Sequence, residues 1–195
     1  MTAVEINRYT RLNELAEQRG IVIFGGSEAK NIPIGELRQA FAVEANMYNR
    51  SIDGLSVTEA AEMYGCCVAP LVPETVLLHI GDADTEFFAG DPDVFDKKYR
   101  ELIAYIRSGN KKCRIAVVSL RNYDENPQIA EMNLHLKYIA ESEQCEYGDI
   151  AGKRVWNPQG TRDAVSFVYS MGFVHPLKNK RPVYDLVRML FCCEQ

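Results

Sequence analysis

The chain has 195 residues, of which 47% are hydrophobic and 25% are charged, and this composition excludes a disordered or fibrous protein. The formal net charge of -5 argues against a nucleic-acid partner, because phosphate contacts require clustered lysine and arginine side chains. No apolar run approaches the length that is needed to cross a bilayer, so we expect no membrane partner either.

The amino-terminal segment indicates a cytoplasmic protein, and the cysteines are then expected to be reduced. Residues 1–20 mix charges of both signs and lack the apolar core of a secretory signal. The six cysteines include no C-x-x-C spacing, and no histidine lies near them at zinc-ligand spacing. We therefore predict reduced thiols and no metal site.

Short apolar runs alternate with helical patterns along the chain. The pattern predicts helices over 7–19, 34–41, 56–65, 93–108, 126–143, 161–171 and 181–191. It predicts strands at 21–24, within 42–54, within 74–84, at 113–120 and at 145–150. This alternation predicts an α/β fold, namely a three-layer α/β/α sandwich with a parallel sheet of about five strands. No linker or repeat divides the chain, so residues 1–195 are expected to form a single domain.

Small and polar residues follow each predicted strand. Ligands of parallel α/β sheets bind at the carboxyl ends of the strands, so these residues are expected to meet at one edge of the sheet. They are Gly25-Gly26-Ser27, Asp53-Gly54, the segment Gly81 to Asp84, Ser119 and Asp149.

The stretch GIVIFGGSEAK, residues 20–30, admits two interpretations. Its glycines either let the backbone close around a phosphate or expose Ser27 on a tight turn. A dinucleotide fingerprint would need a third glycine, and Glu28 would repel a phosphate. The P-loop pattern is absent as well, so we expect no cofactor. The exposed serine is the favoured interpretation, and it requires a base and oxyanion donors.

The chain contains three histidines as candidates for that base. His79 lies inside an apolar run, which indicates a core histidine. His135 lies in the middle of a predicted helix, where a surface or packing role is expected. His175 lies in MGFVHPL, a predicted loop between the last two helices, and is the candidate general base.

The order of these blocks resembles the SGNH hydrolases, also called the GDSL esterase/lipase family. The resemblance covers residues 20–191 and implies a flavodoxin-like fold that hydrolyses esters of lipids, sugars or small acyl compounds. It implies that Ser27 is the nucleophile and that the backbone N–H groups of Ser27 and Gly54 are oxyanion donors. It also implies that His175 is the general base. Gly26, Ala83 and Asp84 are expected to line the site.

The sequence departs from the family pattern in three blocks. Gly26 stands where the first block usually has Asp, Ala83 stands where the third block has an oxyanion-binding Asn, and Gly172 stands where the last block has Asp. Asp149 and Asp163 are the candidate substitutes for the missing acid.

Two functions therefore remain open. The first is an ester hydrolase that acts on a small-molecule ester through a serine nucleophile. The alternative is a catalytically degenerate protein of the same fold that binds an acylated or carbohydrate ligand without turning it over. The missing Asn and Asp favour the binding protein, and the retained Ser, Gly and His favour the hydrolase.

Overall fold

A parallel sheet of five strands forms the centre of the part of the chain that is described in this computed structural model, residues 3–40, 44–122, 124–151 and 191. The strands are β1 (Ile21–Gly25), β2 (Met47–Asn49), β3 (Thr75–His79), β4 (Arg114–Val118) and β5 (Glu146–Gly148). Their order across the sheet is β2-β1-β3-β4-β5, which is the order of flavodoxin-like folds. Each neighbouring pair is parallel. The predicted parallel α/β fold is therefore confirmed, and each predicted strand region contains one strand.

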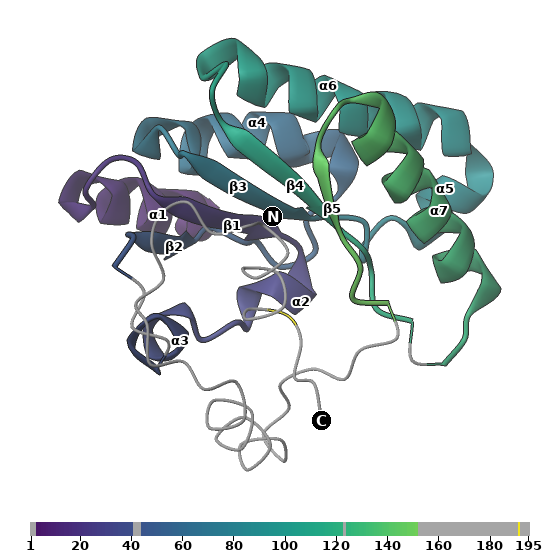
Figure 1. Cartoon of the computed structure of the whole chain (residues 1–195), viewed down its shortest axis with the longest axis horizontal. Helices are drawn as coiled ribbons and strands as arrows, with labels where there is room; N and C mark the ends of the chain where they lie inside the picture. Colours follow the sequence, from purple (N-terminus) through teal and green to yellow (C-terminus); the bar gives the residue numbers. More distant parts are fainter. Residues whose placement is uncertain (1–2, 41–43, 123, 152–190, 192–195) are drawn as a thin grey trace.

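Helices lie on both sides of this sheet (Figure 1). They are α1 (Ala3–Leu15), α2 (Ser27–Lys30), α3 (Ile34–Ala40), α4 (Val57–Cys67), α5 (Thr85–Gly90), α6 (Pro92–Gly109) and α7 (Pro127–Ser142), with a 3-10 turn at Ala69–Leu71. Figure 1 shows α4 and α6 over one face and α2 and α3 on the opposite side. The three-layer α/β/α arrangement is thus as predicted.

The middle strands are apolar because both of their faces are covered. All five positions of β1 and all five of β3 are buried. Side chains alternate between the two faces of a strand, so Val22, Phe24 and Leu78 point into the core beneath α4 and α6. Ile23 and Leu77 point to the other face and are equally buried. This double burial explains why β1 reads as an unbroken apolar run.

The first helix is displaced from its predicted position. It spans Ala3–Leu15 instead of 7–19, because the chain must turn sharply into β1. Arg19 and Gly20 both have positive φ angles, of 74° and 102°, which a helix cannot accommodate. A Cβ at position 20 would lie 2.3 Å from the carbonyl oxygen of Asn46, so only glycine fits there.

The predicted helix over 56–65 extends further than expected. Gly65 was expected to end it, but α4 continues to Cys67. A Cβ at position 65 would lie 2.8 Å from the hydroxyl oxygen of Tyr105 on α6. Gly65 therefore leaves room for the Tyr105 side chain and does not act as a helix stop. The sequence analysis also missed α2 and α5, which have only four and six residues.

The predicted helices at 161–171 and 181–191 lie outside the described residues, except for Phe191.

Within the described ranges, no helix combines the length and apolarity of a membrane span. Cys66, Cys67, Cys113 and Cys145 are free thiols.

Candidate functional site

Ser27 follows the carboxyl end of β1 and begins α2. The two glycines before it allow the turn to pack against the backbone of β3. A Cβ at position 25 would lie 2.2 Å from the carbonyl oxygen of His79, so a side chain there would collide with backbone. The N–H of Gly26 donates to that same carbonyl oxygen at 3.0 Å. The double glycine thus brings Ser27 to the sheet edge, which is partly exposed at this position.

Gly54 lies beside Ser27, as the sequence predicts. Its backbone N–H donates a hydrogen bond to Ser27 Oγ at 3.0 Å. Gly54 has φ of +65°, a conformation that glycine adopts without strain. The loop is held by Ile52, whose side chain is fully buried and whose N–H donates to the carbonyl oxygen of Gly25 at 2.9 Å. Residues 27 positions apart in the chain therefore meet at the ends of β1 and β2.

Asp84 ties the loop after β3 to the loop that carries Gly54. Its carboxylate is 1% exposed and accepts a hydrogen bond from Ser56 Oγ at 2.6 Å. It also accepts from the N–H of Val57, at 3.0 Å to Oδ2. Burial raises the pKa of the Asp84 carboxyl above its ordinary value, because burial outweighs the lowering effect of these hydrogen bonds. Asp84 was expected only to line the site, and the structure gives it a bridging role between two loops.

Ala83 and Asp82, the two residues before Asp84, differ in exposure and contacts. Ala83 is exposed and presents only a methyl group, so its side chain offers no donor. Asp82 Oδ2 accepts a hydrogen bond from the backbone N–H of Glu28 at 3.3 Å. The Asp82 carboxylate thus faces the backbone of the serine turn.

Glu28 belongs to a charged cluster that the sequence analysis missed. Its Oε2 lies 3.0 Å from Nε2 of His79 and 3.6 Å from Nη1 of Arg121. Burial raises the pKa of the Glu28 carboxyl, but the His79 hydrogen bond and the charges of His79 and Arg121 outweigh burial and hold that pKa below its ordinary value. The Glu28 side chain therefore ties the start of α2 to His79 of β3 and to Arg121 beyond β4.

His79 is a buried histidine, as predicted, and it links this cluster to the end of the chain. Its side chain is fully buried, and its ring lies 5.2 Å from the ring of Phe191 in an edge-on arrangement. A common signal could have identified the cluster: Glu28, His79 and Arg121 each lie at or just beyond the carboxyl end of a predicted parallel strand. That is the edge where parallel sheets gather functional groups.

His175, Asp163 and Asp149 are the residues predicted to act in proton transfer. His175 and Asp163 lie outside the described residues, so both remain predictions. Asp149 follows β5, which lies three strands away from β1 in the sheet, or about 14 Å at the usual strand spacing. Its Oδ1 accepts from the N–H of Ala151 at 3.0 Å and from Ser119 Oγ at 3.4 Å. The structure therefore gives Asp149 a role in its own turn and does not bring it beside Ser27.

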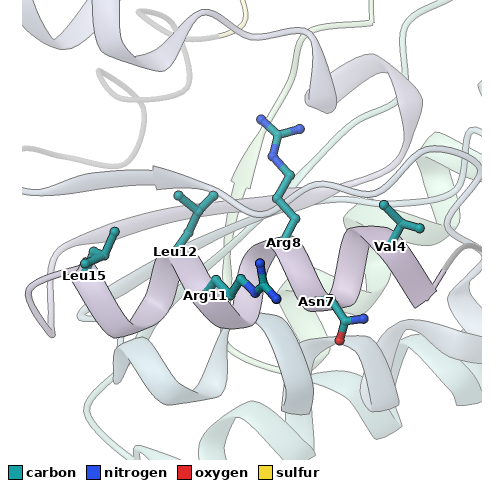
Figure 2. A pocket seen from close by; sticks show the side chains of 6 residues that line it. All are labelled: Val4, Asn7, Arg8, Arg11, Leu12 and Leu15. Atoms are coloured by element: carbon teal, nitrogen blue, oxygen red, sulfur yellow. The ribbon is translucent and has the colours of Figure 1, made fainter.

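A second surface feature lies on the exposed side of α1. Figure 2 shows an open hollow along this helix. It is lined by Val4, Asn7, Arg8, Arg11, Leu12 and Leu15. None of these residues is a predicted site residue.

Comparison with solved structures identifies proteins of the same fold. A candidate acylhydrolase from Bacteroides fragilis superimposes with a TM-score of 0.65 at 18% identity, over 97% of this chain and 95% of that chain. A GDSL-like lipase from Bacteroides thetaiotaomicron superimposes with a TM-score of 0.62 at 17% identity, over 95% and 94% of the two chains. Axe2, an acetylxylan esterase from Geobacillus stearothermophilus, gives a TM-score of 0.52 at 15% identity, over 69% and 78%.

Sequence comparison alone does not identify these relationships. No family model and no curated protein sequence matches the chain. The structural similarity nevertheless confirms the fold that the resemblance to SGNH hydrolases implied, because proteins with GDSL-type and acylhydrolase names share it over most of their length.

Proposed function

We propose that this protein is an ester hydrolase that uses Ser27 as a nucleophile on a small acyl, sugar-acyl or lipid ester. The observation that carries the proposal is the 3.0 Å contact between the backbone N–H of Gly54 and Ser27 Oγ at the carboxyl edge of the sheet. A reactive serine needs donors close to its Oγ, because the carbonyl oxygen of the ester that it attacks becomes an oxyanion next to it. The likeness in fold to acylhydrolases and acetylxylan esterases supports this assignment.

The proposed reaction follows the usual course of acyl transfer. Ser27 Oγ forms a bond to the carbonyl carbon while a base, proposed to be His175, takes the hydroxyl proton. The oxyanion is stabilised by the N–H groups of Ser27 and Gly54. Collapse breaks the bond to the alcohol, which leaves with the proton from the base, and water then releases the acid from Ser27 by the same steps.

The N–H of Ser27 is suited to this role. It stands at the start of α2, where the first N–H groups of a helix have no acceptor within the helix. Among the described residues, the Ser27 N–H has no hydrogen-bond acceptor, whereas the neighbouring N–H of Glu28 donates to Asp82. The N–H of Ser27 therefore remains for a substrate oxygen, and the Gly54 N–H, which donates to Ser27 Oγ here, is proposed to donate to the oxyanion once it forms.

A binding protein of the same fold is the second candidate function. The exposed methyl group of Ala83 favours it, because the family's third oxyanion donor is missing at that position. Loss of one such donor costs about 10²–10³ in rate, which slows an esterase without abolishing it.

Labelling with a fluorophosphonate distinguishes the two candidates, because only an activated serine reacts readily. We expect one adduct per chain by intact mass, located on Ser27 by peptide mapping, and none in Ser27→Ala. Ser108→Ala is the matched control, because Ser108 is an exposed serine on α6. If the folded parent protein is not labelled, or if Ser27→Ala is labelled equally, the hydrolase proposal is wrong and ligand binding becomes the better assignment.

A further inference from the structure

The carboxylate of Asp82 occupies the space that a side chain at position 26 would need. Gly26 has φ of -85° and ψ of -153°, which any residue adopts, so its backbone conformation does not require glycine. A Cβ built at position 26, however, would lie 1.9 Å from Asp82 Oδ1 and 2.6 Å from Asp82 Cγ. A side chain at position 26 would therefore have to displace the carboxylate of Asp82, which comes from the loop after β3.

Asp82 also performs the task that a side chain at position 26 would normally perform. Gly26 is the N-cap residue of α2, and it offers no side-chain cap. An aspartate at an N-cap accepts a hydrogen bond from the backbone N–H two or three residues later. Here the N–H two residues later is that of Glu28, and it donates to Asp82 Oδ2 at 3.3 Å.

The remaining oxygen of this carboxylate is buried and has no hydrogen-bond partner in the described part of the chain. Among the described residues, Asp82 Oδ1 is one of the few buried side-chain oxygens that lack a hydrogen bond. A buried carboxylate oxygen without a partner costs free energy, so the placement needs a compensating benefit. Its position directly against Gly26 indicates that the benefit lies in the serine turn.

This arrangement holds the backbone on both sides of Ser27. The N–H of Gly26 donates to the carbonyl oxygen of His79 at 3.0 Å, and the N–H of Glu28 donates to Asp82. Ser27 Oγ is meanwhile free to meet the N–H of Gly54. We propose that Asp82 is a positioning residue. From the loop after β3, its carboxylate takes the place of a side chain at position 26 and fixes the turn that presents Ser27. The proposal rests on the proposed role of Ser27 as the nucleophile.

Exchanging the two side chains tests the proposal. Asp82→Gly removes the carboxylate, Gly26→Asp places a second one in occupied space, and the double variant Gly26→Asp/Asp82→Gly moves the carboxylate onto the turn itself. We expect each single variant to lower kcat for p-nitrophenyl acetate by about tenfold or more with little change in KM, since small misplacements of a reacting group are costly. The double variant should recover to within about threefold of the parent protein. Asp82→Asn keeps an acceptor oxygen and should retain most of the activity.

A second measurement tests the positioning role of Asp82 independently of the hydrolase proposal. Hydrogen exchange of the Glu28 amide reports on the Asp82 contact whether or not the protein turns over an ester. Exchange should be faster in Asp82→Gly and slow again in the double variant. Asp91→Gly is the matched control, because Asp91 Oδ1 accepts from the N–H of Val94 at the start of α6. It removes the same type of contact and should lower stability while leaving kcat unchanged.

The outcomes are distinct. Recovery of both kcat and amide protection in the double variant supports the proposal. An active parent protein with a double variant as slow as Asp82→Gly overturns it, even if stability recovers. A folded parent protein that neither hydrolyses the ester nor reacts with a fluorophosphonate overturns the proposed function instead, and Glu28 exchange then still decides whether Asp82 holds this turn.

Discussion

Asp84 accepts a hydrogen bond of 2.6 Å from Ser56 Oγ and thereby joins two loops at the carboxyl edge of the sheet. The loop after β3 contributes the buried carboxylate, and the loop after β2 contributes the hydroxyl and the N–H of Val57. Gly54 lies two residues before Ser56, so this contact anchors the loop from which the Gly54 N–H donates to Ser27 Oγ. The geometry around Ser27 therefore depends on a residue that does not itself touch Ser27 Oγ in any described contact.

The first prediction concerns Asp84→Ala. This change leaves the Ser56 hydroxyl and the Val57 N–H without their acceptor, and we expect the free energy of unfolding to fall by about 1–3 kcal/mol. Urea denaturation at pH 7 measures the effect. Asp53→Ala, which removes an exposed carboxylate from the loop after β2, is the control and should change stability little. A midpoint for Asp84→Ala equal to that of the parent protein would contradict the bridging role.

The second prediction concerns the missing oxyanion donor. Ala83→Asn places an amide at an exposed turn position, where asparagine is well tolerated. If this amide reaches the oxyanion, kcat/KM for a short acyl ester should rise about tenfold or more. Ala89→Asn, at an exposed alanine of α5, is the matched control and should give no gain. A folded Ala83→Asn protein without a gain would mean that the loop after β3 does not face the reacting carbonyl.

The third prediction concerns the base. His175→Ala should lower kcat/KM by about 10²–10⁴, the usual contribution of general acid–base catalysis. In the parent protein, kcat/KM should fall at acid pH, because a protonated imidazole cannot accept the serine proton. His135→Ala is the control, since His135 Nδ1 pairs with Asp96 on α6 at 2.9 Å. Equal loss in both variants, or none in His175→Ala, would remove His175 from the proposed mechanism.

The fourth prediction concerns the charged cluster at Glu28. Since the pKa of Glu28 is lowered in the folded protein, its ionised form stabilises the fold above its ordinary pKa, and this contribution is lost as the pH falls. The stability difference between the parent protein and Glu28→Gln should therefore be largest above about pH 5 and shrink toward about pH 3.

Urea midpoints at several pH values check this prediction. Glu62→Gln removes an exposed carboxyl on α4 and serves as the matched control. A Glu28→Gln difference that grows as the pH falls would show that the contacts with His79 and Arg121 do not favour the ionised carboxylate.

The sequence predicts most of the sheet correctly because its signals are local. The run IVIF is buried on both faces of β1, and RIAVV is buried in the same way over most of β4, so hydrophobicity alone identifies these strands. Gly25 and Gly26 indicate the turn that carries Ser27 for the same reason, since two glycines directly after an apolar run are a signal within the local sequence. Short helices such as α2 carry no such signal, because four residues do not complete a hydrophobic pattern.

The sequence by itself determined the alternation of strands and helices and the placement of Ser27 and Gly54 after two of the strands. Only the tertiary structure decided what surrounds them: the contact of Asp82 with the turn at Gly26, the bond between Asp84 and Ser56, and the pairing of Glu28 with His79 and Arg121. The physical reason is the strand order. Because β1 lies between β2 and β3, the loops after three different strands converge on one serine, and no local pattern records which side chains then meet.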